Sequence, residues 1–445
     1  MKISWLDISE RIKYELRQLS EEGNNVDAFQ KEWMAIEKSK LSETELREKA
    51  ELFYRKIEET HLKNFNEKSE VAAWKDLLQI CNIRDNEVPA FSTSFIEDRI
   101  LGGWLGRCAG CLLGKPVEKI PREGIKELLQ SNNTWPITDF ITEFGIPKIL
   151  LEKYPWNKHS GRESLKENIE CMTEDDDLNY PIINLVVHEK YGDQLTTENV
   201  IQTWMEMLPV LSTFTAERVA YVNALNGVIP PETAINRNPY REWIGAQIRA
   251  DFWGWISPSQ PSRAAEFAWR DASLSHVQNG IYGEIFFSAA VASSFKYNDV
   301  EDIIYQALSY IPSYSRFAEA IRFVLSLPIV KQPWDVTVDT LYKKFGNYYW
   351  VHTINNAALV VAALISSDGD FEKAICNTVM GGWDTDSNGA TVGSILGTML
   401  GAEKLPSKWI APLNNRIRTS LKGFDNSLIS DLAKRTVIQA KYLTK

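Results

Sequence analysis

Clustered basic residues and long apolar runs are scarce in this sequence, and each scarcity argues against a class of binding partner. Its 445 residues include 49 lysines and arginines against 59 aspartates and glutamates, which gives a net charge of −10. That balance argues against a general nucleic-acid or anionic-membrane binder, because such binding depends on clustered Lys and Arg. No stretch reaches the ~18 apolar residues of a membrane span, and the N-terminus lacks a signal-peptide core. We therefore expect a soluble, cytoplasmic protein with no nucleic-acid or membrane partner.

Cysteine is also scarce, with five residues scattered along the chain: Cys81, Cys108, Cys111, Cys171 and Cys376. An odd and scattered set is typical of a reducing compartment. Cys108 and Cys111 have CxxC spacing, but no second pair exists to complete a zinc site. Because the pair lies in a helical run rather than after a strand, we expect neither a redox nor a metal role for it.

Strand-like alternation is scarce as well, whereas helical spacing of apolar residues recurs along the chain. Residues 93–445 are predicted to form one all-α domain. Residues 1–92 read as a separate, charge-rich helical extension, with helix-capping signals at Asp7 and Ser42. Trp253-Gly254-Trp255 is followed by prolines and is expected to be an ordered loop.

Two helical segments carry glycine at every fourth position, and we call these sets the glycine stripes. An interior glycine destabilises a helix by roughly 1 kcal/mol relative to alanine. Two stripes therefore predict that bare helix faces let neighbouring helices approach closely. The first stripe is Gly102, Gly106, Gly110 and Gly114, and the second is Gly389, Gly393, Gly397 and Gly401.

Two acidic clusters, about 210 residues apart, carry the strongest functional signal. They are Glu174-Asp175-Asp176-Asp177 and the Asp384-Thr385-Asp386-Ser387 segment that follows Trp383. Each precedes a probable helix, so the acids could simply cap it, but one cap needs only one carboxylate. Converging carboxylates raise one another's pKa unless a cation neutralises them. Oxygen ligands of this kind suit Mg²⁺ above all, with Mn²⁺ close behind.

Three segments, taken in order, resemble the ADP-ribosylglycohydrolase family. They are residues 106–118 (GRCAGCLLGKPVE), residues 173–177 (TEDDD) and residues 381–389 (GGWDTDSNG). The resemblance covers roughly residues 95–425 and leaves the N-terminal extension unexplained. It implies a compact, orthogonal multi-helix all-α fold with two Mg²⁺ ions in a central cleft.

By position, the resemblance also implies roles for individual residues. Glu118 would match the glutamate of the first motif, and His276, after Ser275, would line the substrate cleft. An apolar-face histidine is, however, often a satisfied core residue. The metal ligands implied by the second and third motifs are Glu174, Asp175, Asp176, Asp384, Asp386 and Ser387.

The chain departs from the family pattern at several positions. Glu174 and Ser387 each replace a threonine, Cys111 stands where the family commonly has aspartate, and Trp383 is inserted before the first aspartate of its motif. These departures indicate a divergent branch whose substrate need not be ADP-ribosylated arginine or serine.

The resemblance therefore predicts a metal-dependent hydrolase that cleaves an N- or O-glycosidic bond of an ADP-ribosyl or related ribosyl substrate. A carboxylate would take a proton from the attacking water, and Glu118 and Asp175 are both candidates. Three alternatives stay open on the sequence: a non-catalytic binder of ADP-ribose or a nucleotide, a metal-dependent phosphohydrolase, and an interaction protein whose acids only cap helices.

Overall fold

The computed structural model describes residues 3–63, 73–81 and 88–444, and almost all of the regular secondary structure in these residues is helical. This confirms the prediction of an all-α fold. The α-helices after the N-terminal arm are α4 (Trp74–Cys81), α5 (Thr93–Gly114), α6 (Arg122–Ser131), α7 (Lys148–Lys153), α8 (Asp176–Tyr191), α9 (Thr197–Met207), α10 (Thr215–Leu225), α11 (Glu232–Ile235), α12 (Ala250–Trp255), α13 (Pro261–Ala272), α14 (Gln278–Ser293), α15 (Val300–Leu308), α16 (Arg316–Leu325), α17 (Trp334–Phe345), α18 (Thr353–Ser367), α19 (Phe371–Met380), α20 (Thr385–Leu400), α21 (Ser407–Ile410) and α22 (Ile429–Gln439).

Short elements complete the described structure. Strand β1 (Ala90–Phe91) pairs in parallel with β4 (Leu443–Thr444), and β2 (Arg416–Ile417) pairs antiparallel with β3 (Ser427–Leu428). The 3-10 helices are η1 (Lys115–Val117), η2 (Gly192–Gln194), η3 (Val210–Ser212), η4 (Gln247–Arg249), η5 (Ile329–Lys331), η6 (Ala402–Lys404) and η7 (Ala411–Leu413). Among the described helices, none is both long enough and apolar enough to cross a membrane.

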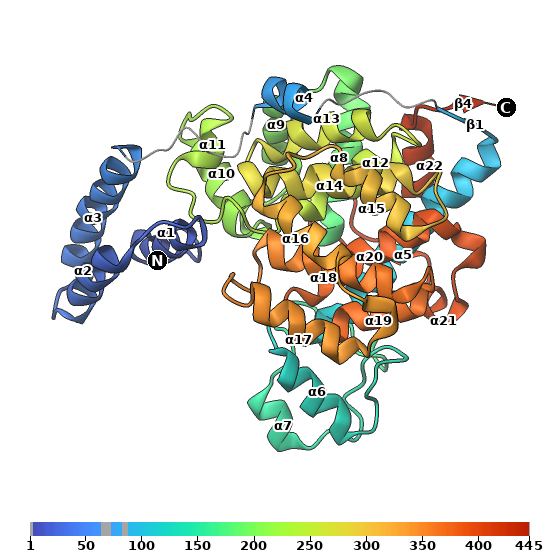
Figure 1. The fold of residues 1–445 in the computed structure, drawn as a ribbon, viewed down its shortest axis with the longest axis horizontal. Helices are drawn as coiled ribbons and strands as arrows, with labels where there is room; N and C mark the ends of the chain where they lie inside the picture. Colours follow the sequence, from blue (N-terminus) through green and yellow to red (C-terminus); the bar gives the residue numbers. More distant parts are fainter. Residues whose placement is uncertain (1–2, 64–72, 82–87, 445) are drawn as a thin grey trace.

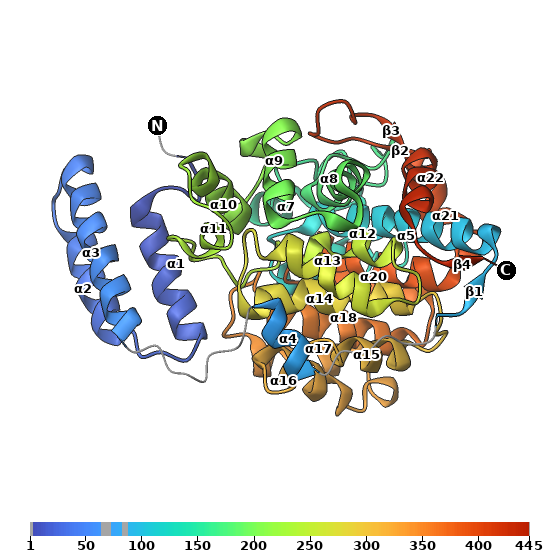
Figure 2. The same cartoon turned by 90° about the horizontal axis from the view of Figure 1, so that it is seen from above.

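The N-terminal arm consists of α1 (Ile8–Glu21), α2 (Asp27–Lys38) and α3 (Glu43–Lys63), and it projects from one side of the helical body (Figure 1). The apolar faces of these helices form a small core of their own, which includes Ile12, Trp33 and Phe53. Figure 2 shows the same projection from above, with α1 nearest the body.

Aromatic side chains join α1 to the body. The Tyr14 ring lies against the rings of Tyr240, Trp243 and Tyr349, with centroid distances of 5.3, 5.4 and 5.7 Å. Arg241 adds an ion pair to Glu15 at 3.0 Å. Buried aromatic contacts of this kind contribute both apolar area and ring–ring attraction, so α1 is packed onto the body along its length rather than only tethered to it.

The two glycine stripes pack against each other, and α5 and α20 run antiparallel through the centre of the body. A Cβ built on Gly106 would lie 2.1 Å from the carbonyl oxygen of Gly393, and one on Gly393 would lie 2.0 Å from that of Gly106. The missing side chains therefore allow backbone-to-backbone contact. Gly401 is glycine for a different reason. It ends α20 with a φ of +84°, and a Cβ at this position would lie 1.8 Å from a carboxylate oxygen of Asp98.

The expected loop at residues 253–255 is instead helical, because these residues lie in α12. Both tryptophans are fully buried. The Trp255 ring lies 4.7 Å from that of Trp104, and its Nε1 donates to Thr398 Oγ1 at 3.0 Å. Contacts with α5 and α20 thus outweigh the local turn tendency of a glycine followed by prolines.

Candidate metal centre

The close packing of α5 and α20 brings three chain segments together. At the end of α5, η1 carries Lys115 and leads to Glu118. The other two segments are helix N-termini, where Asp175 caps α8 and Asp384 precedes α20. The Thr385 hydroxyl donates to the Gly114 carbonyl at 2.8 Å, which fixes the start of α20 to the end of α5. Helix N-termini favour negative charge, so this junction is suited to hold carboxylates.

Lys115 lies at the centre of the junction and is only 5% exposed. Its Nζ lies 2.8 Å from Asp386 Oδ2 and 3.0 Å from Glu118 Oε2, and it also contacts Asp175 Oδ2. Burial alone would lower the pKa of Lys115, but the carboxylates of Asp175, Asp386 and Glu118 outweigh burial and raise it well above its usual value. The side chain is therefore a buried ammonium that three acids share.

Glu118, Asp384 and Asp386 form the first carboxylate group, with one oxygen of each lying within 4.8 Å of the others. Burial raises the pKa of Asp384 well above its usual value, and the charges of Asp386 and Glu118 raise it further. Asp386 Oδ1 is buried and has no hydrogen-bond partner among the described residues. Three carboxylates with an unpartnered buried oxygen fit a hard divalent cation such as Mg²⁺ or Mn²⁺.

A second group consists of Cys111, Asp175 and Asp177, whose ligand atoms also lie within 4.8 Å of one another. Arg107 pairs with Asp177 at 3.1 Å, and the Ser387 hydroxyl donates to the same carboxylate at 2.9 Å. Burial raises the pKa of Asp177, as does the neighbouring Asp175, whereas Arg107 opposes the rise. Burial also raises the pKa of the Cys111 thiol well above its usual value, so Cys111 stays neutral here.

The remaining predicted ligands lie at the edge of these groups. Asp176 is partly exposed, and the pKa of its carboxyl is raised well above the usual value by burial and by Asp175 and Asp177. Glu174 accepts a hydrogen bond from Asn179 at 2.9 Å and another from the Ser420 hydroxyl. Its carboxylate is thus held beside α8 and not on Lys115. Metal ligation by Glu174 and Asp176 stays a prediction.

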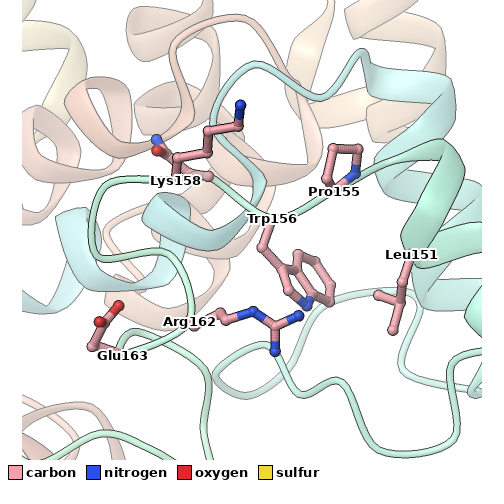
Figure 3. A pocket seen from close by; sticks show the side chains of 7 residues that line it. Leu151, Pro155, Trp156, Lys158, Arg162 and Glu163 are labelled. Atoms are coloured by element: carbon pink, nitrogen blue, oxygen red, sulfur yellow. The ribbon is translucent and has the colours of Figure 1, made fainter.

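Glu118 is hydrogen-bonded to a residue that lines a cavity. Its carboxylate accepts from Lys119 at 2.9 Å and from the side-chain amide of Asn157. Asn157 is one of the residues around a cavity of about 320 Å³, which Figure 3 shows from close by. The other lining residues are Leu151, Pro155, Trp156, Lys158, Arg162 and Glu163.

His276 is almost completely buried and belongs to a different polar cluster. Its Nδ1 lies 2.8 Å from Ser275 Oγ, and its Nε2 lies 3.9 Å from Glu217 Oε1. Burial lowers the pKa of His276 well below its usual value, and the Arg249 charge lowers it further. The ring is therefore neutral, and a contact between it and a substrate stays a prediction.

Sequence reasoning missed Lys115, Asp177, Arg107 and Asn157. A lysine just after a helix, such as Lys115, usually indicates a solvated partner of the helix dipole, and Arg107 lies inside α5, where no motif marks it as an ion-pair residue. Asp177 was visible as the fourth acid of its cluster, but only the register of α8 turns it toward Arg107. Asn157 lies outside every motif, and no signal in the sequence marks it.

These features agree with comparison to known proteins. The sequence profile described as ADP-ribosylglycohydrolase matches residues 92–441. The chain therefore belongs to the ADP-ribosylglycohydrolase family, a family of hydrolases, as its motifs predicted. A solved structure described as an "ADP-ribosylglycohydrolase-related protein complex" superposes with a TM-score of 0.48 at 15% identity, covering 78% of this chain and 98% of that chain. A search of curated protein sequences gives no match.

Proposed function

We propose that the protein is a metal-dependent hydrolase that cleaves an N- or O-glycosidic bond of an ADP-ribosyl or related ribosyl substrate. The observation that carries the proposal is the convergence of Glu118, Asp384 and Asp386 from two distant segments, with a buried Asp386 oxygen left unpartnered. Lys115 contacts Glu118 and Asp386 but not Asp384, so a further cation would be needed to keep all three carboxylates ionised. Family membership adds the class of reaction, because the family consists of glycohydrolases.

Glu118, Asp384 and Asp386 would hold Mg²⁺ or Mn²⁺, with Asp175, Asp176, Glu174 and Ser387 as further candidates. A bound divalent ion would orient the ribose hydroxyls and make a nearby water easier to deprotonate. The surrounding carboxylates would stabilise the positive charge that develops at the anomeric carbon in an oxocarbenium-like transition state.

We assign the role of general base, which accepts the proton of the attacking water, to Glu118 rather than to Asp175. The Glu118 side chain is 11% exposed, whereas that of Asp175 is fully buried. Glu118 also accepts a hydrogen bond from Asn157, which lines the cavity, whereas Asp175 has no such link to a cavity-lining residue among the described residues. Lys158 and Arg162 line the same cavity, and such cations attract the diphosphate of an ADP-ribosyl group.

Product analysis tests the proposal. The purified protein is incubated with Mg²⁺ and a panel of N- and O-linked ADP-ribosyl compounds, and the products are separated by liquid chromatography with mass detection. We expect free ADP-ribose or a ribosyl sugar. Inorganic phosphate or AMP would instead indicate a phosphohydrolase, and saturable binding without turnover would indicate a binding protein.

A matched pair of variants links the activity to this site. Glu118→Gln should lower kcat by at least a hundredfold, as expected for the loss of a general base. Glu123→Gln removes a charge five residues away at an exposed position and should leave kcat unchanged. Equal rates for the two variants would contradict the role assigned to Glu118.

A further inference from the structure

The Lys115 ammonium lies between the two carboxylate groups described above. It contacts Asp175 of the Cys111–Asp175–Asp177 group, and Glu118 and Asp386 of the Glu118–Asp384–Asp386 group. An ammonium has three N–H donors and no acceptor, and here three carboxylates surround it. A cation that bridged the two groups would need the same oxygens and the same space.

Each group contacts two of the described cationic side chains, but the first group has three acids and the second has two. Asp175 contacts Lys115, and Asp177 pairs with Arg107 at 3.1 Å. Cys111 in the same group is a neutral thiol, so protein cations already balance the acids there.

The Glu118–Asp384–Asp386 group is balanced less completely. No cationic side chain among the described residues pairs with Asp384, and Asp386 Oδ1 is buried without a hydrogen-bond partner. Lys115 reaches Asp386 only through Oδ2. Lys119 pairs with Glu118, so the acid of this group that no described cationic side chain contacts is Asp384, and the Asp386 oxygen without a partner lies in the same group.

We propose that the Lys115 ammonium takes the place of one metal ion, so that the site binds a single divalent cation at Glu118, Asp384 and Asp386. The inference rests on the proposed function, since it assumes that a metal binds at all. It departs from the expectation of two Mg²⁺ ions that the family resemblance gave. The second position is filled by a cation that the chain supplies and that cannot dissociate.

Mn²⁺ stoichiometry tests the inference without an activity assay. Isothermal titration calorimetry of the full-length protein should give one Mn²⁺ per chain for the wild type and two for Lys115→Ala, which vacates the central position. Lys119→Ala is the control, because Lys119 also pairs with Glu118 but is 53% exposed; this variant should bind one ion. Electron paramagnetic resonance should show an isolated Mn²⁺ in the wild type and a coupled pair in Lys115→Ala.

The outcomes separate this inference from the proposed function. Two ions in the wild type would overturn the inference while leaving a metal-dependent hydrolase intact. One ion in both the wild type and Lys115→Ala would also overturn it, because Lys115 would then fill no metal position. No ion in either protein would overturn the metal-dependent function itself. If Lys115→Ala does not fold, Lys115→Ser, which also vacates the central position, carries the same expectation of two ions.

Discussion

A methyl group added at Gly110 should push the two central helices apart. An ideal Cβ at this position lies 1.9 Å from the carbonyl oxygen of Gly389, and a Cβ on Gly389 would in turn lie 2.3 Å from that of Gly110. The obstructing atoms belong to the backbone, so no side chain can rotate away. Gly110→Ala therefore requires α5 and α20 to separate by more than 1 Å over part of their length.

Two effects of opposite sign set the magnitude. Replacing an interior helical glycine with alanine stabilises a helix by about 1 kcal/mol. Overpacking of a close-packed core typically destabilises by 1–3 kcal/mol, and occasionally more. Because the contact here is backbone against backbone, we place the gross penalty at or above the top of that range. The net loss of unfolding free energy should be about 2–4 kcal/mol, which for a chain of this length corresponds to a Tm lower by about 2–5 °C.

Thermal unfolding followed by circular dichroism measures this loss. The control is Glu97→Ala, which makes a substitution to alanine at an exposed position of the same helix and should change Tm by less than about 1 °C. Gly110→Ala should also weaken Mn²⁺ binding, because separation of the helices moves Glu118 away from Asp386. An unchanged or higher Tm for Gly110→Ala would refute the argument that close backbone approach requires the glycine stripes.

Two further predictions concern buried charges. Arg107→Leu leaves Asp177 and Asp251 buried without their cation and should lower the unfolding free energy, measured in urea, by about 3–5 kcal/mol. The control Arg418→Leu breaks an exposed ion pair and should lower the unfolding free energy by less than about 1 kcal/mol. Equal losses for the two variants would contradict this prediction. Burial raises the pKa of Glu217 from 4.5 to about 7, so the folded state favours the protonated carboxyl. This contribution to stability is fully present below pH 4.5 and is lost as the pH rises through about 7. Glu217→Gln should therefore destabilise the protein more at pH 5 than at pH 8, by up to about 3 kcal/mol, and a difference of opposite sign in urea titrations would show the reasoning to be wrong.

The helical architecture could be predicted from the sequence because its signals are local. Apolar spacing and helix caps marked most helices, and Asp7 does cap α1 by accepting hydrogen bonds from the backbone of Ser9 and Glu10. The glycine stripes also predicted close helix packing. The two stripes pack on each other in antiparallel register. Because they lie almost 300 residues apart in the sequence, no local pattern specifies this pairing.

The site was predictable in outline but not in detail. The acidic clusters identified the segments that meet, but the charge balance depends on Lys115, which reads in the sequence as an ordinary lysine after a helix. Because α8 begins at Asp176, its first turn directs Asp177 inward to Arg107, while Glu174 precedes the cap and reaches Asn179 instead. The position where a helix begins and the direction of its side chains determine which of several adjacent acids enters the site, and both are properties of the fold.

The dependence of Tm on Mn²⁺ concentration, measured for the wild type and for Asp386→Asn, tests the central claim most directly. A ligand present at a hundred times its Kd stabilises the folded state by about 2.7 kcal/mol, so the wild-type Tm should rise by several degrees and then saturate. Asp386→Asn removes a ligand charge from the Glu118–Asp384–Asp386 group and should show little of this rise, while its metal-free Tm stays equal to or above that of the wild type. Equal, saturating shifts in both proteins would mean that the ion binds elsewhere and would contradict a metal centre at this junction.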